Sequence, residues 1–229
     1  MDRKFVISIA LLCWPLTVAM SHAAETVITE GQRIASSGAH GAAACISCHG
    51  AKGEGNAAAG FPYLAGQGSA YLLKQLNDIA DGVRPSPVMQ AIAKALTPDE
   101  RQAVSVYFSA LPHPFDAAAL AADSDRPVTE RGEWLASRGA WDKNIPACNQ
   151  CHGPAGTGVG TTFPALAGQS KNYLIAQLRA WQTGKRSPLP LGLMPAVAYQ
   201  LSAEDIEAVS SYYAGLPVSA RAAVSGSQK

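Results

Sequence analysis

Two short segments hold the residues best suited to chemistry, and both have the same spacing. Cys45, Cys48 and His49 form a CxxCH pattern within "CISCHG", and "CNQCHG" at 148–153 repeats it. Two thiols separated by two residues can bind zinc, cycle as a redox disulfide, or form thioether bonds to a haem whose iron binds the adjacent histidine. The rest of the sequence has to decide among these three chemistries.

Haem attachment is the interpretation that the sequence favours. A four-cysteine zinc site has its two pairs about 15–20 residues apart, whereas Cys48 and Cys148 are 100 positions apart. A thioredoxin-like disulfide needs a βαβ context, for which there is no signal here. We therefore predict two covalently bound haem c groups as cofactors. Their thioether bonds would come from Cys45, Cys48, Cys148 and Cys151, and their first axial iron ligands would be His49 and His152.

Methionines are the candidates for the second axial ligands. Met1 and Met20 lie in an N-terminal segment that we expect to be removed, which leaves Met89 and Met194. These two occupy matching places, in the Pro-rich stretches "RPSPVMQ" and "SPLPLGLMPA", where we expect loops between helices. A single methionine usually fills a core, but a matched pair indicates His/Met coordination of both irons. Such coordination raises the reduction potential and suits electron transfer.

The sequence repeats well beyond the cysteines. Three further segments recur: "FPYLAGQ" (61–67) as "FPALAGQ" (163–169), "YLLKQLNDIADGVR" (71–84) as "YLIAQLRAWQTGKR" (173–186), and "LTPDERQAVSVYFSALP" (96–112) as "LSAEDIEAVSSYYAGLP" (201–217). We therefore predict two homologous domains, residues 24–112 and residues 129–229, the second with a short tail after 217. The acidic segment 113–128 would link them.

The composition favours an all-α fold. Hydrophobic residues make up 48% of the chain and charged residues 15%, which excludes a disordered protein. Val and Ile are sparse, and no segment alternates as a strand would. Apolar stripes with helical spacing predict helices after Ser69 and Ser170, which would act as N-caps, and after Thr97, where "TPDE" forms a capping box.

The N-terminus has the pattern of a secretory signal peptide. A basic start, "MDRK", precedes sixteen largely apolar residues and the small residues of "SHAAE". We predict that residues 1–23 form the signal, with cleavage after Ala23 or Ala24, and that the mature protein is periplasmic. An uncleaved membrane anchor is the alternative, although the apolar run is shorter than the ~20 residues of a membrane span.

The sequence gives weaker indications of function for three other histidines and for two arginines. His22, His40 and His113 have no counterparts in the other repeat, and we expect a place at the signal boundary or on the surface. Arg84 and Arg186 match between the repeats. Each could bind a haem propionate through its guanidinium, or could be an ordinary surface arginine.

The order of these motifs resembles the dihaem cytochrome c4 family. The resemblance covers nearly the whole chain after the signal segment and is carried by CxxCHG, "LAGQ", "YLxxQL", the methionine and the ending "GLP" in both repeats. It implies two class I cytochrome c domains related by pseudo-twofold symmetry. It also implies that the backbone carbonyls of Pro62 and Pro164 bind the proximal histidines His49 and His152.

The resemblance implies a periplasmic protein that carries single electrons between respiratory complexes toward a terminal oxidase, not an enzyme. The alternative is an electron-accepting subunit of a periplasmic dehydrogenase, for example a flavin-dependent sulfide dehydrogenase. A dihaem peroxidase would need an open iron face, which two matched methionines oppose. Expected partners are a quinol-oxidising cytochrome bc complex, a terminal oxidase or a dehydrogenase. We expect no nucleic acid, and peripheral membrane association is left open.

The charge is distributed unevenly between the two repeats. Residues 24–112 carry six basic and seven acidic side chains, whereas residues 129–229 carry nine basic and six acidic ones. Positive surroundings favour the ferrous state, because reduction adds an electron. We therefore predict that the haem attached to Cys148 and Cys151 has the higher reduction potential.

Overall fold

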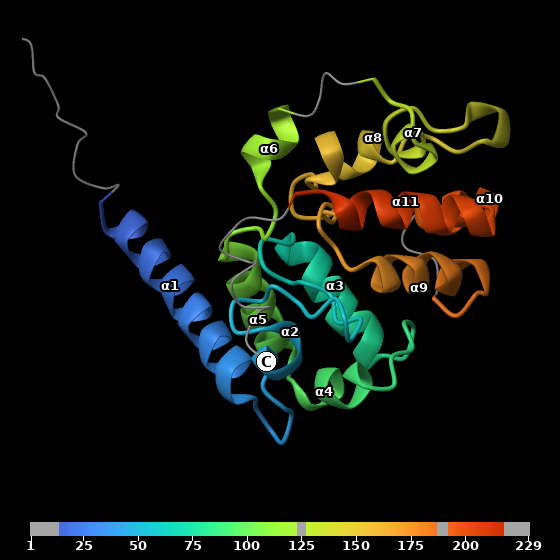
Figure 1. Cartoon of the computed structure of the whole chain (residues 1–229). Coiled ribbons are helices and arrows are strands. Elements are labelled where there is room, and N and C mark those ends of the chain that lie inside the picture. Colours follow the sequence, from blue (N-terminus) through green and yellow to red (C-terminus); the bar gives the residue numbers. More distant parts are fainter. Residues whose placement is uncertain (1–13, 123–126, 187–191, 218–229) are drawn as a thin grey trace, which may run out of the picture.

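The computed structural model describes residues 14–122, 127–186 and 192–217, and these residues are mostly helical (Figure 1). The helices of the first half are α1 (Trp14–Ser37), α2 (Ile46–His49), α3 (Ser69–Ala80), α4 (Met89–Ala95) and α5 (Pro98–Ala110). Those that follow are α6 (Ala117–Ala122), α7 (Arg131–Ser137), α8 (Asn149–His152), α9 (Lys171–Gln182), α10 (Leu193–Gln200) and α11 (Ala203–Gly215), with 3-10 turns at Trp141–Lys143 and Pro154–Gly156. Strand-like pairing in the described residues is limited to isolated bridges, so the all-α prediction is confirmed.

The two halves repeat one helical arrangement. In the first half, α5 packs against α1 and α3, and α3 also packs against α4. In the second half, α11 packs against α7 and α9, and α9 packs against α10. Figure 1 shows the two groups side by side, with α3 of one facing α9 of the other.

A glycine lets the first and last helices of each half cross closely. A Cβ atom at Gly31 in α1 would collide with the carbonyl oxygen of Ala103 in α5. A Cβ atom at Gly132 in α7 would collide in the same way with the carbonyl oxygen of Ala208 in α11. The matching glycines therefore hold the same crossing in both repeats.

The helix caps agree with the sequence except in one place. The Thr97 hydroxyl accepts a hydrogen bond from the Glu100 backbone N–H, and the Glu100 carboxylate accepts one from Thr97, so the capping box is confirmed. Ser170 caps α9 with its side chain, as predicted. The prediction for Ser69 is wrong. Gly68 occupies the N-cap and Ser69 is the first helical residue, because Gly68 already has the extended backbone that an N-cap needs.

The segment expected to be a signal peptide is described only in part. Residues 1–13 lie outside the described residues, and residues 14–23 form the first turns of α1, whose N-terminal end projects from the rest of the molecule (Figure 1). Among the described residues, none of the helices has the length and apolar character that crossing a membrane requires.

The segment expected to be a linker packs against the second half. Phe115 and Leu120 are buried in a cluster with residues of that half. The backbone N–H of Asp116 donates to the carbonyl oxygen of Pro217 at 2.9 Å. Residues 115–120 therefore pack with the second half, while residues 123–126 lie outside the described residues.

Candidate functional site

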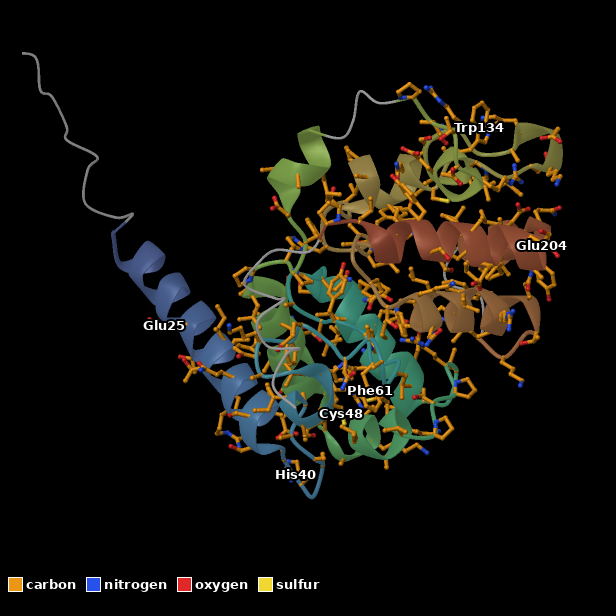
Figure 2. All side chains as sticks on the ribbon, in the orientation of Figure 1. Glu25, His40, Cys48, Phe61, Trp134 and Glu204 are labelled. Carbon is orange, nitrogen blue, oxygen red and sulfur yellow. The ribbon has the colours of Figure 1, made fainter. Side chains whose placement is uncertain are left out.

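Helix α2 places the first CxxCH motif in a single turn. Cys45 is the N-cap of this helix, and the His49 backbone N–H donates to the Cys45 carbonyl oxygen at 2.9 Å. Residues three apart lie on one face of a helix, so Cys45 and Cys48 point to the same side while His49 is buried at the end of the turn. Figure 2 shows Cys48 and Phe61 in this part of the molecule, and the rings of His49 and Phe61 lie 6.2 Å apart.

Helix α8 repeats this arrangement with Cys148 as its N-cap and a buried His152. The four cysteines of the two motifs are all free thiols, and no cluster of three metal-ligating side chains occurs among the described residues. Burial raises the pKa of Cys45 and raises that of Cys148 to about 11. The two CxxC pairs lie in separate halves and do not come together as one cluster of metal-ligating side chains among the described residues, which opposes a shared four-cysteine zinc site.

Both histidines are oriented by a proline carbonyl. His49 Nδ1 donates to Pro62 O at 2.8 Å, and His152 Nδ1 donates to Pro164 O at 2.8 Å, as the resemblance implied. This bond leaves Nε2 of each ring available to bind a metal. Burial lowers the pKa of both histidines, and the bond to the proline carbonyl offsets part of that shift. Each imidazole is therefore neutral, as an iron ligand must be.

Glycine-rich loops bring the prolines to the histidines. After the first motif, the chain turns back through Gly55, whose N–H donates to the His49 carbonyl oxygen at 2.7 Å and whose φ is 81°. Gly158 makes the same bond to His152 at 2.7 Å, with φ of 86°. Only glycine adopts this backbone readily, so these glycines close each loop and place the proline beside the ring.

The two methionines lie on matching helices instead of in loops. Met89 is the first residue of α4, is half-buried and packs against a cluster of Ile79, Ala80 and Ala93. Met194 is the second residue of α10 and is also half-buried. The loop prediction is wrong in this detail, because "MQAIAKA" and "LMPAVAYQ" contain enough Ala and other helix formers to start a helix at once.

A symmetric polar ring joins the two halves. Each of two arginines donates to both of two glutamines: Arg84 to Gln75 Oε1 (3.1 Å) and Gln177 Oε1 (2.7 Å), and Arg186 to Gln177 Oε1 (3.0 Å) and Gln75 Oε1 (2.6 Å). Arg84 also donates to the Tyr173 hydroxyl at 2.9 Å. Arg186 is only 5% exposed and Arg84 is half-buried, so neither is an ordinary surface arginine.

A second set of reciprocal hydrogen bonds between the halves is made by the glutamines that end the "LAGQ" segments. Gln67 donates to the Ala165 carbonyl oxygen and accepts from the Ala165 N–H, both at 2.9 Å. Gln169 donates to the Tyr63 carbonyl oxygen at 3.3 Å and accepts from the Tyr63 N–H at 3.2 Å. Sequence reasoning missed this role. The signal was the exact repetition of a polar residue within an otherwise apolar "LAGQ".

Known proteins match both halves. A family model described as "Cytochrome c" matches residues 28–112, and one described as "Cytochrome C oxidase, cbb3-type, subunit III" matches residues 135–212. The solved structure of reduced cytochrome c4 from Pseudomonas stutzeri is 34% identical, with a TM-score of 0.65, over 82% of this chain and 97% of that chain. The chain belongs to the dihaem cytochrome c4 family. Its two cytochrome c domains each carry one covalently bound haem c.

Two further relatives of this dihaem cytochrome carry a more specific description. The "Thiosulfate dehydrogenase electron acceptor" of Stutzerimonas stutzeri is 45% identical over 207 residues, which is 89% of this chain and 94% of the relative. The structure of thiosulfate dehydrogenase TsdBA from Marichromatium purpuratum is 40% identical with a TM-score of 0.72. The match covers 83% of this chain but only 40% of that longer chain.

The polar ring of the cytochrome fits the carboxylates of its haems. Among the described residues, the printed side-chain hydrogen bonds of the Arg84 and Arg186 guanidinium groups go to uncharged oxygens, and the nearest carboxylate influence on Arg84 is that of Asp78. Buried charges need compensation, and each haem contributes two propionates. The Arg186 guanidinium also lies 4.0 Å from the Trp181 ring, whose Nε1 is buried without a partner among the described residues.

His40 and His113 lie at the surface, as expected. His40 is exposed and its Nε2 lies 3.0 Å from Glu100 Oε1, within the α5 capping box. His113 is exposed at one edge and stacks on Phe115, with ring centroids 4.5 Å apart. His22 lies outside the residues whose side chains are described. Neither His40 nor His113 therefore replaces a proximal ligand.

Proposed function

We propose that this cytochrome accepts electrons from a thiosulfate dehydrogenase and passes them singly to the respiratory chain. The observation that carries the proposal is the order of similarity among the relatives. Two relatives described as thiosulfate dehydrogenase electron acceptors are 45% and 47% identical, whereas those described as cytochrome c4 are 35–38% identical. The match to TsdBA, a thiosulfate dehydrogenase by its description, points in the same direction.

Eight residues of the chain hold the two haems in this proposal. The thioether bonds come from Cys45 and Cys48 in the N-terminal domain and from Cys148 and Cys151 in the C-terminal domain, and the axial ligands are His49 with Met89 and His152 with Met194. The observations in favour are the matched α2 and α8 turns and the two histidines aimed by proline carbonyls. Because both axial positions are filled by side chains, no substrate binds at the iron, which suits electron transfer and opposes peroxidase chemistry.

The number of redox centres suits the proposed donor. Joining two thiosulfate ions through a new S–S bond releases two electrons. Two cytochrome c domains accept one electron each, so one molecule of the cytochrome can take up the electrons of one such oxidation. In this proposal electrons pass between the two haems across the interface of the domains. The polar ring and the "LAGQ" glutamines hold the two halves together at that interface.

The proposed location is the periplasm. Residues 1–23 would direct export and be removed after Ala23 or Ala24. Mass spectrometry of the protein purified from its native host would test this. A chain that begins at Ala24 or Glu25 supports export, and one that retains residues 1–23 would favour the membrane-anchor alternative.

Stopped-flow spectroscopy tests the proposed donor directly. The oxidised cytochrome is mixed with thiosulfate and a purified thiosulfate dehydrogenase, such as that of Stutzerimonas stutzeri, and haem reduction is followed. We expect two equivalents of haem to be reduced only when enzyme and thiosulfate are both present. Reduction no faster than with thiosulfate alone would contradict the proposal, and a mitochondrial-type cytochrome c of similar potential serves as the control acceptor.

A carrier that feeds a terminal oxidase is the second candidate. The near full-length match to cytochrome c4 from Pseudomonas stutzeri favours it. The sulfide dehydrogenase subunit considered from the sequence is replaced here by an electron acceptor for thiosulfate dehydrogenase. The reason is that the relatives' descriptions name thiosulfate, not sulfide. Rapid oxidation of the reduced protein by oxidase-containing membranes, together with no reduction by thiosulfate dehydrogenase, would favour the second candidate.

A further inference from the structure

One peptide group in each domain connects the proximal histidine to a glutamine of the other domain through two hydrogen bonds. The peptide group between Pro164 and Ala165 accepts a bond from His152 Nδ1 at its carbonyl oxygen, at 2.8 Å. Its N–H, which belongs to Ala165, donates to Gln67 Oε1 at 2.9 Å. Gln67 belongs to the N-terminal domain, so a continuous chain of hydrogen bonds runs from that domain to the proximal histidine of the C-terminal domain.

The same chain of bonds exists in the opposite direction. The peptide group between Pro62 and Tyr63 accepts from His49 Nδ1 at 2.8 Å, and its N–H donates to Gln169 Oε1 at 3.2 Å. Gln169 belongs to the C-terminal domain. The proximal histidine of each domain is therefore linked through one peptide group to a glutamine of the other domain.

These links are shielded from water. Gln67 and Gln169 are each 3% exposed, and Tyr63 and Ala165 are 3% and 4% exposed. Each amide also donates back to the backbone residue of the other domain from which it accepts, which fixes its orientation, and Gln169 Oε1 accepts a further bond from the Ser170 N–H at 2.9 Å. In a poorly solvated site, successive hydrogen bonds polarise one another and strengthen by about 10–30% per bond.

We propose that Gln67 and Gln169 are positioning residues that set the electronic character of the histidine in the opposite domain. A glutamine oxygen that accepts from the peptide N–H increases the electron density on the carbonyl oxygen of the same peptide group. That oxygen then accepts more strongly from Nδ1–H, which makes the imidazole a better electron donor to iron. A more electron-rich ligand stabilises ferric iron and lowers the reduction potential of that haem. The proposal rests on His49 and His152 as iron ligands and does not depend on the identity of the electron donor.

Gln67→Met tests the proposal in the haem-loaded, full-length protein. Methionine has a similar length but provides no amide acceptor for the Ala165 N–H. We expect the one-electron equilibrium of the C-terminal haem to shift about threefold toward the ferrous state, which is about 30 mV because a tenfold shift is about 59 mV. The N-terminal haem, in the domain that carries the substitution, should keep its potential.

Two independent readings identify the haem that responds. A spectroelectrochemical titration gives both potentials, and NMR assigns them through haem methyl signals with contacts to residues of each domain. In the reduced protein, the His152 Nδ1–H signal should move toward that of a weaker hydrogen bond. The His49 Nδ1–H signal should remain in place.

Matched variants separate this effect from general damage to the interface. Gln169→Met should shift the N-terminal haem and leave the C-terminal haem unchanged. Tyr63→Phe removes another buried bond between the halves, from the Tyr63 hydroxyl to the Ala167 carbonyl oxygen at 3.1 Å, but leaves both chains of bonds intact. It should shift neither potential.

The proposal requires each glutamine substitution to change the reduction potential of the haem in the opposite domain only. If either glutamine variant shifts the haem of its own domain, shifts both haems equally or shifts neither, the proposal is wrong. Should Gln67→Met fail to give a soluble holoprotein, Gln169→Met alone decides by the same criterion. Equal shifts in the Tyr63→Phe control would also overturn the proposal, because loosening of the interface would then suffice as the cause.

Discussion

The Tyr213 hydroxyl donates a 2.7 Å hydrogen bond to Asn149 Oδ1, directly beside the thiol of Cys148. Tyr213 is 2% exposed and Asn149 is half-buried, and this bond ties α11 to the CxxCH turn of the C-terminal domain. In the N-terminal domain the matching residues are Phe108 and Ile46, an apolar pair. The two haem-attachment turns are therefore held by different physical interactions.

Tyr213→Phe should destabilise the holoprotein by about 1–2 kcal/mol, because the half-buried Asn149 oxygen loses its donor. The double variant with Asn149→Ile recreates the apolar pair of the other domain and should recover part of this loss. Chemical denaturation followed by circular dichroism measures both. Tyr199→Phe, at a side chain that is 61% exposed, is the control and should cost nothing measurable. Additive losses in the double variant would contradict the argument.

The number of haems can be changed one at a time through the cysteines. Denaturing mass spectrometry of the mature wild type should show two haems added to the chain. Replacing Cys45 and Cys48 with alanine should leave one haem, and replacing Cys148 and Cys151 should leave the other, because each pair provides all the thioether bonds of one domain. A wild-type product with a single haem would contradict the assignment.

Met89→Ala and Met194→Ala test the distal ligands. Each substitution should abolish the Met–Fe(III) charge-transfer absorption of one haem and leave that of the other, because α4 and α10 serve separate domains. The intensity of the band in the oxidised protein should fall by about half in each variant and vanish in the double variant. A variant that keeps the full wild-type band would show that its methionine is not a ligand.

Asp205 should make the stability of the C-terminal domain depend on pH. Burial alone would raise the pKa of Asp205, but hydrogen bonds from Arg131 and Ser202 outweigh burial, and the pKa lies below its ordinary value. A carboxylate with a lowered pKa in the folded state stabilises that state above its unfolded pKa of about 3.9. This stabilisation is lost as the pH falls through the lower pKa of the folded state.

Asp205→Asn should therefore cost about 1 kcal/mol at pH 7, a modest value because the Arg131 side chain is 45% exposed. The difference from the wild type should shrink below about pH 4 and disappear in stronger acid. Urea denaturation at a series of pH values measures it. Glu130→Gln, beside Arg131 in sequence, is the control, and a pH-independent difference for Asp205→Asn would contradict the mechanism.

Arg186→Gln tests whether buried cations help to set the two potentials. Removal of a positive charge near the haems favours the ferric state, so we expect one or both potentials to fall, by about 20–40 mV for a unit charge ~12 Å from iron. Redox titration of the wild type also tests whether the C-terminal haem has the higher potential. Arg179→Gln, on the same domain but outside the polar ring, is the control, and an equal fall there would show that net charge alone is responsible.

The fold and the two CxxCH turns were accessible from sequence because they depend on local patterns. The CxxCH turns, the capping box at Thr97 and the repeated helices each leave a signature within one segment. The placement of Met89 was missed in detail because helix starts after prolines are poorly defined by composition. Arg84 was recognised as a matched residue, but its burial was not, because its partners come from the other half.

The least accessible features were contacts between residues about one hundred positions apart. Gln67 bonds to Ala165 backbone atoms, and no local pattern specifies such a partner. Exact repetition was the one available clue: a polar residue kept within "LAGQ" in both halves needs a buried partner, and the backbone of the opposite half supplies it. Trp181 and Tyr213 are both buried, and each has a polar atom whose environment no local pattern specifies.

The reciprocal exchange of identical residues between the halves has an evolutionary consequence. Gln67 does for one half what Gln169 does for the other, and Arg84 and Arg186 enter one ring from opposite sides. Such self-complementary contacts are the mark of an isologous dimer. A single-domain ancestor with one copy of each residue could have paired with itself, and gene duplication and fusion would then have made that pairing permanent. Once both copies lay on one chain, each could diverge independently. Trp181, for example, stands at the position that Ile79 occupies in the other repeat.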